Sequence, residues 1–484
     1  MKTLQLFKHM GNRAGVLFLL LFGTISVGAN AQVSDSLSAY LQLAAQNNPM
    51  LKSRFMQYSA ALERVPQVGA LPDPQLTFSA YVKPMELMGG NQVATIQLMQ
   101  MFPWFGTLAA ARDEMSMMAK AKLQQVELEK QQLFFGVKQQ WFALYLNKEN
   151  IRVTEQSIAL LKVLENIVLA QYSTGGGAPA SSTSSMEKGT ASSSVGGTMS
   201  GAMNGGAPKG NSTVMAASAG GGMGSGTSLA DLLSIRIQLK DLENRLLLYT
   251  DRQNTLTVKF NSLLNRESDT PVALPDTVLA MSTKVSMDAL LDTILANNPM
   301  VRMFSAEGES YGAMAKKASR MGYPMVGLGF SYMVINPRSG NASPMNGNDM
   351  VMPMVSVTLP IYRKKYGAMR REAELLQQSA TDATDDARNK LTAEFAQAKE
   401  MFSDANRRVT LNEEQATLAG QTLNLLLAGY SVSTSTLNDV LRMEQQLLDY
   451  RFATVQAVVD QQLAVAMLEK LAAQPFYESK DASR

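Results

Sequence analysis

Cysteine and histidine, which carry much of the metal and nucleophilic chemistry of proteins, are almost absent from this chain. It has no cysteine, and its one histidine, His9, lies in the N-terminal segment. Zinc, haem and iron–sulfur sites of the usual kind need these residues, as do Ser–His and Cys–His nucleophiles. The sequence also has no phosphate-binding loop and no paired-carboxylate motif. It therefore predicts no enzyme, no cofactor and no disulfide.

Methionine sulfur is the soft ligand that the sequence does offer, and a biased segment carries several of these side chains. Residues 174–223 are mostly Gly, Ser, Ala and Thr. Their five methionines are Met186, Met199, Met203, Met215 and Met223. Thioether sulfur suits Cu(I), so one hypothesis is that this segment captures a soft metal. The alternative is a disordered loop in a chain with 32 methionines, because such a composition buries too little surface to become ordered.

The N-terminus has the pattern of a secretory signal. Basic residues precede an apolar run from Ala14 to Ala29, and Ala29-Asn30-Ala31 offers the small residues at which a signal peptidase cuts. We expect residues 1–31 to be removed. The alternative, a membrane anchor, fits a run this short less well. No later segment approaches the ~20 consecutive apolar residues of a spanning helix, and a net charge of +3 does not indicate a nucleic-acid partner.

Three short motifs occur twice, in the same order. Asn47-Asn48-Pro49-Met50 recurs at 297–300, and the Leu-Ala-x-Tyr-Ser of 169–173 recurs at 427–431. Ser-Leu-x-Asp-Leu-Leu at 228–233 is echoed by Thr-Leu-x-Asp-Val-Leu at 436–441. Ordered matches of this kind indicate duplicated structure. We predict a first repeat over 32–280, which contains the insertion 174–223, a second over 281–471, and a tail over 472–484.

Each half contains two candidate strands, within 74–102 and 324–360. Apolar residues alternate with polar or small ones in these segments, and a period of two puts one set on each face of a sheet. The Gly-, Asn- and Pro-containing stretches Lys83–Asn91 and Ile335–Asp349 are expected to be hairpin loops. One apolar and one polar face is typical of a membrane barrel. A half-buried sheet of a soluble domain is the alternative, because the barrel signal of each strand is weak.

Long helices are predicted after each strand pair. No proline interrupts Gly106–Tyr172 or Gly367–Tyr430, and returning helices are expected over Leu229–Leu264 and Leu437–Leu471. Within Gly106–Tyr172, apolar residues recur at spacings close to 3.5 residues, which gives one stripe along a supercoiling helix. The stripe consists of Leu123, Val126, Leu133, Val137, Trp141, Leu144, Ile151, Ile158, Leu161 and Val168. The hairpins therefore span about 106–264 and 367–471, and a short helix broken at the Asn-Asn-Pro motif precedes each strand pair.

Such long helices need partners beside them, and four strands cannot close a barrel. Three copies would supply both the partners and twelve strands, an even number as in most bacterial barrels. The predicted fold class is mainly α with a β-barrel part. Duplicated long α-hairpins form one part, and four membrane strands per protomer complete a twelve-stranded barrel in a homotrimer.

From about Ser36 to Leu471 the sequence resembles the TolC-type outer-membrane efflux family. The motifs that carry this resemblance are the two Asn-Asn-Pro segments, Phe102-Pro103-Trp104-Phe105-Gly106, Leu359-Pro360-Ile361-Tyr362, and Ala428-Gly429-Tyr430-Ser431-Val432 followed by Asp439-Val440-Leu441. The resemblance implies a barrel in the outer membrane lipid and a periplasmic α-barrel. It also implies a periplasmic adaptor protein and an inner-membrane pump of the resistance-nodulation-division or ABC type as partners. The turns 172–228 and 430–436 would then form a periplasmic tip, from which the 174–223 segment hangs.

The resemblance also implies an aperture at this tip. In the family, a tyrosine and an arginine of the second turn bridge to an aspartate of a neighbouring hairpin. Tyr430 and Asp231 match the tyrosine and the aspartate, whereas Ser435 stands at the arginine position. Some members have two acidic rings, of which Asp439 matches the first, and Arg442 stands at the second. Such a pair of rings should be less cation-selective than two acidic ones. For Asp439 the alternative is a helix-capping or first-turn acid, and both roles can hold.

Together these observations predict the outer-membrane channel of a tripartite efflux system, which conducts its substrates passively, with heavy metals or drugs as candidate cargo. One alternative is the outer-membrane duct of a type I protein secretion system. A periplasmic adaptor is a further one, although an adaptor would have a single hairpin flanked by lipoyl-like and β-barrel modules.

Overall fold

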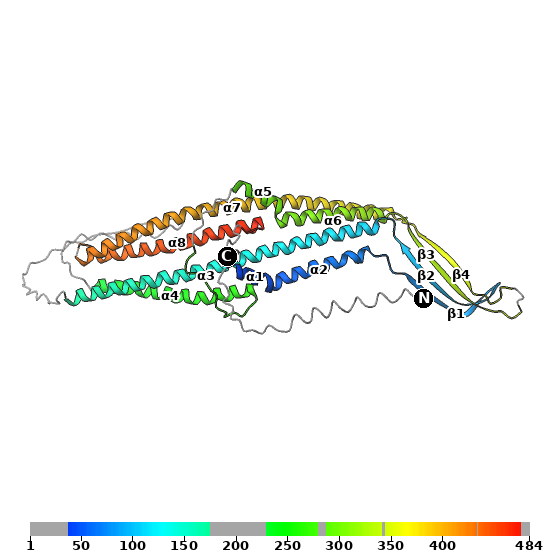
Figure 1. Ribbon diagram of the computed structural model, residues 1–484, viewed down its shortest axis with the longest axis horizontal. Helices are drawn as coiled ribbons and strands as arrows, with labels where there is room; N and C mark the ends of the chain where they lie inside the picture. Colours follow the sequence, from blue (N-terminus) through cyan, green and yellow to red (C-terminus); the bar gives the residue numbers. More distant parts are fainter. Residues whose placement is uncertain (1–36, 175–228, 279–286, 341–343, 433, 476–484) are drawn as a thin grey trace, which may run out of the picture. The chain divides into compact units, whose positions relative to one another are not determined.

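The computed structural model describes residues 37–174, 229–278, 287–340, 344–432 and 434–475 (Figure 1). The predicted signal segment and all five methionines of the 174–223 segment lie outside the described residues. The chain divides into two compact units. We call Met1–Tyr145, Asn254–Asp404 and Val458–Arg484 the sheet unit, and Leu146–Gln253 with Ala405–Ala457 the hairpin unit. Within the described ranges, no helix combines the length and the apolar character needed to cross a membrane.

The same series of elements occurs twice along the chain. The two long helices have 68 and 69 residues, and the two returning helices have 36 residues each. The first series is α1 (Leu37–Asn47), α2 (Pro49–Gly69), β1 (Gln75–Leu87), β2 (Gly90–Phe102), α3 (Thr107–Thr174) and α4 (Leu229–Leu264). The second is α5 (Met287–Asn297), α6 (Pro299–Met321), β3 (Met325–Asn336), β4 (Met350–Thr358), α7 (Arg363–Ser431) and α8 (Leu437–Ala472). The duplicated helical hairpins predicted from the sequence are confirmed.

The second asparagine of the Asn-Asn-Pro motif follows α1, caps α2 and forms a hydrogen bond to α4. The Asn48 Oδ1 caps α2 by accepting the backbone N–H groups of Met50 and Leu51, at 2.9 and 3.1 Å. Its Nδ2 donates to the carbonyl of Leu263, in the last turn of α4, at 3.1 Å. Pro49 then occupies the first helical position, where its missing N–H costs nothing.

Asn298 repeats this arrangement in the second half. Its Oδ1 accepts from the Met300 N–H at 2.8 Å, and its Nδ2 donates to the Leu471 carbonyl, at the end of α8, at 2.8 Å. Each amide therefore satisfies at least one of the orphan donors at the start of one helix and one of the orphan acceptors at the end of another.

The four strands form one antiparallel sheet in the order β1-β2-β3-β4 (Figure 1). The strands β1 and β2 extend through most of Lys83–Asn91, so the prediction of a loop there was wrong. A two-residue turn at Met88 and Gly89 joins them, since Leu87 pairs with Gly90. Pro84 had indicated a loop, but β1 is an edge strand with a register shift between Ala80 and Met85, where a residue without an N–H is tolerated. The loop predicted over Ile335–Asp349 matches the gap between β3 and β4.

The register separates the side chains of the sheet into an apolar and a mixed face. The pairs Phe78↔Ile96, Ile96↔Tyr332 and Tyr332↔Val351 place these four residues on one face. We call this the apolar face. Exposed large hydrophobic side chains on it are Leu76, Phe78, Val326, Leu328, Phe330, Val351, Val355 and Val357. The opposite face carries threonine, serine, glycine, glutamine and methionine.

Each unit has its own apolar core. In the sheet unit, α5, α6, α7 and α8 bury a cluster that includes Ile294, Leu391 and Phe395. In the hairpin unit, α3, α4, α7 and α8 contribute to a cluster that includes Leu161, Ile235 and Val440. Most of the stripe predicted on α3 is buried, including Val137, Leu144, Leu161 and Val168.

Candidate functional site

The hairpin unit contains all five predicted aperture residues, and Tyr430 is the one most deeply set. Tyr430 lies near the end of α7 and is part of the core of this unit. Its hydroxyl is buried and has no hydrogen-bond partner within the described part of the chain. Burial raises the pKa of Tyr430, and the negative charge of Asp231 raises this pKa further. The structure therefore places Asp231 and Tyr430 within electrostatic reach of each other.

The turn between α7 and α8 closes on the carbonyl of Gly429. This oxygen accepts the Thr434 N–H at 2.8 Å, the Thr434 hydroxyl at 3.0 Å and the Val432 N–H at 3.3 Å. A side chain at Gly429 would collide with the hydroxyl of Ser435, because the turn folds directly over this residue. Ser435 is half-buried against the turn and brings no charge to it. The ionic part of the family's latch therefore has no counterpart at this position.

Asp439 lies in the first turn of α8 and pairs with Thr436, the residue that caps this helix. The Thr436 hydroxyl donates to the Asp439 Oδ2 at 2.7 Å, and the Asp439 N–H donates to the Thr436 Oγ1 at 3.3 Å. The Thr436 hydroxyl oxygen thus caps α8, and the Asp439 carboxylate lies at the positive end of the α8 dipole. Arg442 follows one turn later and is exposed. Of the alternative expected for Asp439, a helix-capping or first-turn acid, the structure contains the first-turn position.

Asp231 has the same place in the first repeat as Asp439 has in the second. It is the third residue of α4, which begins at Leu229, as Asp439 is the third residue of α8, which begins at Leu437. Each carboxylate is favoured in the first turn by the helix dipole. Asp231 is half-buried, whereas Asp439 is exposed. The duplication thus supplies two equivalent acids, of which only the α4 one acts on Tyr430.

Glu444, a buried acid that the sequence did not single out, lies further along α8. Its side chain accepts a hydrogen bond from the Ser157 hydroxyl of α3, and Glu444 is 5% exposed. Burial raises the pKa of Glu444, while the Ser157 hydrogen bond and the charge of Arg451 lower it. Neither residue belongs to a repeated motif, and they lie 287 positions apart, so only the fold reveals the pair.

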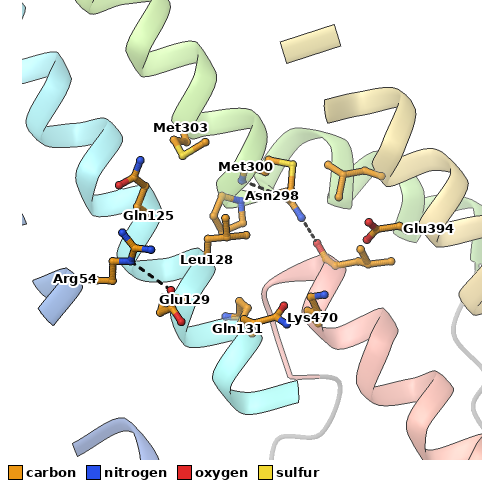
Figure 2. A pocket seen from close by; sticks show the side chains of 14 residues that line it. Arg54, Gln125, Leu128, Glu129, Gln131, Asn298, Met300, Met303, Glu394 and Lys470 are labelled. Atoms are coloured by element: carbon orange, nitrogen blue, oxygen red, sulfur yellow. Dashed lines mark hydrogen bonds and ion pairs between the residues drawn. The ribbon is translucent and has the colours of Figure 1, made fainter. Parts of the chain in front are cut away.

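A cavity of about 440 Å³ lies in the sheet unit next to the Asn298 junction. Figure 2 shows the side chains that line it. The Arg54 Nε lies 3.4 Å from a carboxylate oxygen of Glu129, and Glu394 and Lys470 also line the cavity. Its lining mixes both charges with leucine and methionine side chains. No group of His, Cys, Asp or Glu in the described residues is arranged to hold a metal ion. We interpret the cavity as a by-product of the helix junction and assign it no ligand.

Comparison with known proteins gives a fold and no sequence relative. No protein-family model matches the chain, and no curated protein matches it. The outer membrane protein VceC of Vibrio cholerae matches with a TM-score of 0.67 at 14% identity, over 91% of this chain and 97% of that one. The CusC structure, described in terms of transmembrane channel formation, gives 0.68 at 15% identity, over 91% and 93%.

The open state of the Neisseria gonorrhoeae MtrE outer membrane channel gives a TM-score of 0.65 at 14% identity, over 91% of this chain and 89% of that one. The chain is thus similar in fold to outer-membrane channels over about nine-tenths of its length. The fold expected from the resemblance to the TolC-type family is confirmed.

Proposed function

We propose that this chain is the protomer of a homotrimeric outer-membrane efflux channel. In this proposal the channel passively conducts substrates that an inner-membrane pump and a periplasmic adaptor hand over, and it catalyses no reaction. The observation that carries the proposal is the sheet, which combines an apolar exposed face with two unpaired edges. The fold that the chain has in common with outer-membrane channels supports it.

The sheet is unfinished in one copy. Strands β1 and β4 are its edges, and their outer N–H and C=O groups have no strand partner in the described sheet. In lipid every backbone polar group must be paired within protein, so a sheet that enters a membrane must close on itself. Neighbouring strands of the sheet alternate in direction, so β1 and β4 run in opposite directions. In a ring of copies, β4 of one copy and β1 of the next would therefore run antiparallel, and three copies would give twelve strands.

The exposed face also suits lipid. A contiguous exposed apolar surface of this kind marks an interface with protein or membrane. At the end of the sheet that adjoins the long helices, aromatic side chains are exposed. These are Trp104, Phe105, Tyr323 and Tyr362. Aromatic residues gather at the boundary between membrane and water in outer-membrane barrels, which supports insertion of the strands up to this level.

The helices of the hairpin unit supply a second reason for several copies. On α7, Leu411, Leu418 and Leu425 follow one another at steps of seven, and all three are exposed. A heptad stripe of this kind is the seam of a coiled coil, and it requires a neighbouring helix. We call these residues the α7 stripe, and a second copy of this chain is the proposed neighbour.

Fractionation of a Gram-negative host that expresses the chain tests the proposal. We expect the protein in the outer-membrane fraction, and an oligomer in detergent gels that becomes monomeric only on heating. A monomer in the soluble periplasmic fraction would contradict the proposal. Loss of the chain should also raise the cellular level of a substrate of its pump, and expression of the chain should restore export.

The aperture is proposed to lie at the turns, with rings of Asp231, Asp439 and Arg442 lining the passage. Three copies turn the exposed Arg442 into a ring of positive charge, which opposes the passage of cations. We expect Arg442→Glu to shift the reversal potential in a salt gradient towards cation selectivity. Arg252→Glu, an equal charge change at an exposed position on α4, serves as the control. Equal shifts in both variants would remove the special role of Arg442.

A further inference from the structure

The mixed face of the sheet is unusually rich in sulfur. Residues of β2, β3 and β4 that pair across this face include seven methionines. They are Met99, Met101, Met325, Met333, Met350, Met352 and Met354. Thioether sulfur is a weak hydrogen-bond acceptor, so methionine is a poor choice for a face that only needs to be wetted.

Two of these sulfur atoms, those of Met99 and Met101, lie beside Gly327. In the register, Met101 pairs with Gly327 and Gly327 pairs with Ser356, so the glycine lies between two strands that carry donor atoms. A Cβ built on Gly327 would lie 2.6 Å from the Met101 sulfur and 3.6 Å from the Met99 sulfur, and it would also meet the Ser356 hydroxyl. The absence of a side chain at Gly327 therefore lets the donor atoms of Met101 and Ser356 come together at the position that a Cβ would occupy.

The hydroxyl of Ser356 is directed at the same sulfur atoms. Its Oγ lies 3.4 Å from the Met99 Sδ and 3.8 Å from the Met101 Sδ. Two thioethers from adjacent positions on one face of β2 and a hydroxyl from β4 thus lie together beside Gly327, and all three side chains are half-buried. Both sulfur atoms therefore have a polar neighbour in the Ser356 hydroxyl.

From this geometry we propose that Met99 and Met101, with Ser356 beside them, form a binding site for a soft monovalent cation, Cu(I) or Ag(I). Soft thioether ligands select such ions, whereas carboxylate and carbonyl oxygens suit Mg²⁺ and Ca²⁺. The donors are neutral, so the site offers no charge to attract a hard divalent cation. The proposal needs only the sheet of one copy. In the proposed channel this face is the one turned away from lipid, where passing ions would meet it.

Oxidation footprinting on the purified full chain in detergent tests the site residue by residue. Hydrogen peroxide converts methionine to its sulfoxide, and a sulfur bound to a metal is protected. With one equivalent of Ag(I), which needs no reductant, we expect oxidation of Met99 and Met101 to slow on the order of tenfold. Met350 and Met352, on the same face, should keep their rates, and Zn(II) should protect none of the four. Unchanged rates at Met99 and Met101 would overturn the proposal.

Two sets of variants locate the site. Gly327→Ala places a methyl group at the position where the donor atoms of Met101 and Ser356 come together, so these atoms must move apart. We therefore expect this variant to abolish the protection of both sulfurs. Met99→Leu with Met101→Leu should remove the tightest class of Ag(I) binding in a titration, whereas Met352→Leu with the exposed Met56→Leu should retain it. Ag(I) binding that survives the first pair unchanged would contradict the site. The oligomeric state of each sample is measured alongside, so failure of the site and failure of the proposed assembly are told apart.

Discussion

The buried side chain of Asn298 caps α6 and also binds the end of α8. We predict that Asn298→Ala lowers the free energy of unfolding by about 2 kcal/mol, because it removes a helix cap and leaves the Leu471 carbonyl buried without a partner. Asn298→Ser keeps a capping oxygen but loses the amide donor, so its free energy of unfolding should lie between those of the parent and of Asn298→Ala. Chemical denaturation of the detergent-solubilised chain measures both effects. Equal stabilities of the alanine and serine variants would refute the cap.

Glu444 makes the hairpin unit sensitive to pH. Its raised pKa means that the folded chain holds a proton more tightly than the unfolded chain. The stability from this group is thus fully present below the ordinary pKa of 4.5 and is lost as pH rises through the folded pKa. We predict that Glu444→Gln, which can still accept the Ser157 hydrogen bond, is more thermally stable than the parent at pH 8, with a gain that disappears towards pH 4.

The exposed Glu413 on α7 provides the matched control for this prediction. Glu413→Gln should change the melting temperature by the same small amount at both pH values. A Glu444→Gln variant whose melting temperature follows the parent in parallel from pH 4 to pH 8 would show that the buried carboxyl is not responsible.

At this scale the sequence revealed motifs and missed partners. The Asn-Asn-Pro repeat was visible, and the proline explained the break between the helices. The hydrogen bonds that the side-chain amides of Asn48 and Asn298 donate to the ends of α4 and α8 were not visible in the sequence, because their acceptors lie 215 and 173 positions away. Asp439 was recognised both as an aperture residue and as a capping acid, and the local Thr436 pairing is the part that the structure contains.

Among the elements, the long helices were the easiest to predict. Helix α4 has the predicted bounds, and α8 ends one residue beyond them. Proline-free length and a repeat near 3.5 residues are properties of the chain itself. Strand β1 was harder, because Pro84 is compatible with a strand only when that strand is an edge, and the edge is a property of the sheet.

The α7 stripe gives a prediction at the level of the element. Leu418→Lys with Leu425→Lys places charges on the seam and should reduce the heat-sensitive oligomer strongly while leaving the helical content of the chain intact. The matched control is Thr417→Lys with Asn424→Lys, exposed neighbours one position before each leucine. Gel mobility without heating and circular dichroism provide the two measurements. An oligomer that persists in the leucine variant would mean that α7 has no neighbour along this stripe.

At the scale of the whole molecule, one chain leaves the sheet and the α7 stripe without partners. The proposed trimer rests on the four-stranded sheet with its unpaired edges and on the α7 stripe, neither of which is complete in one copy. The face with Gly327 and the methionines becomes the inner face of this assembly if the apolar face meets lipid. The architecture and the proposed metal site therefore depend on the same sheet but are tested separately.

Closure of the sheet between copies is the central claim, and disulfide trapping tests it most directly, since the chain has no cysteine of its own. Thr77→Cys on β1 is combined in turn with Met352→Cys, Met354→Cys, Ser356→Cys or Thr358→Cys on β4, so that four registers between neighbouring copies are sampled. The single Thr77→Cys variant is the control. After oxidation in outer membranes we predict covalent dimers and trimers in at least one register, with nothing larger. Monomers in all four registers, or a ladder that continues beyond three chains, would contradict a closed ring of three copies.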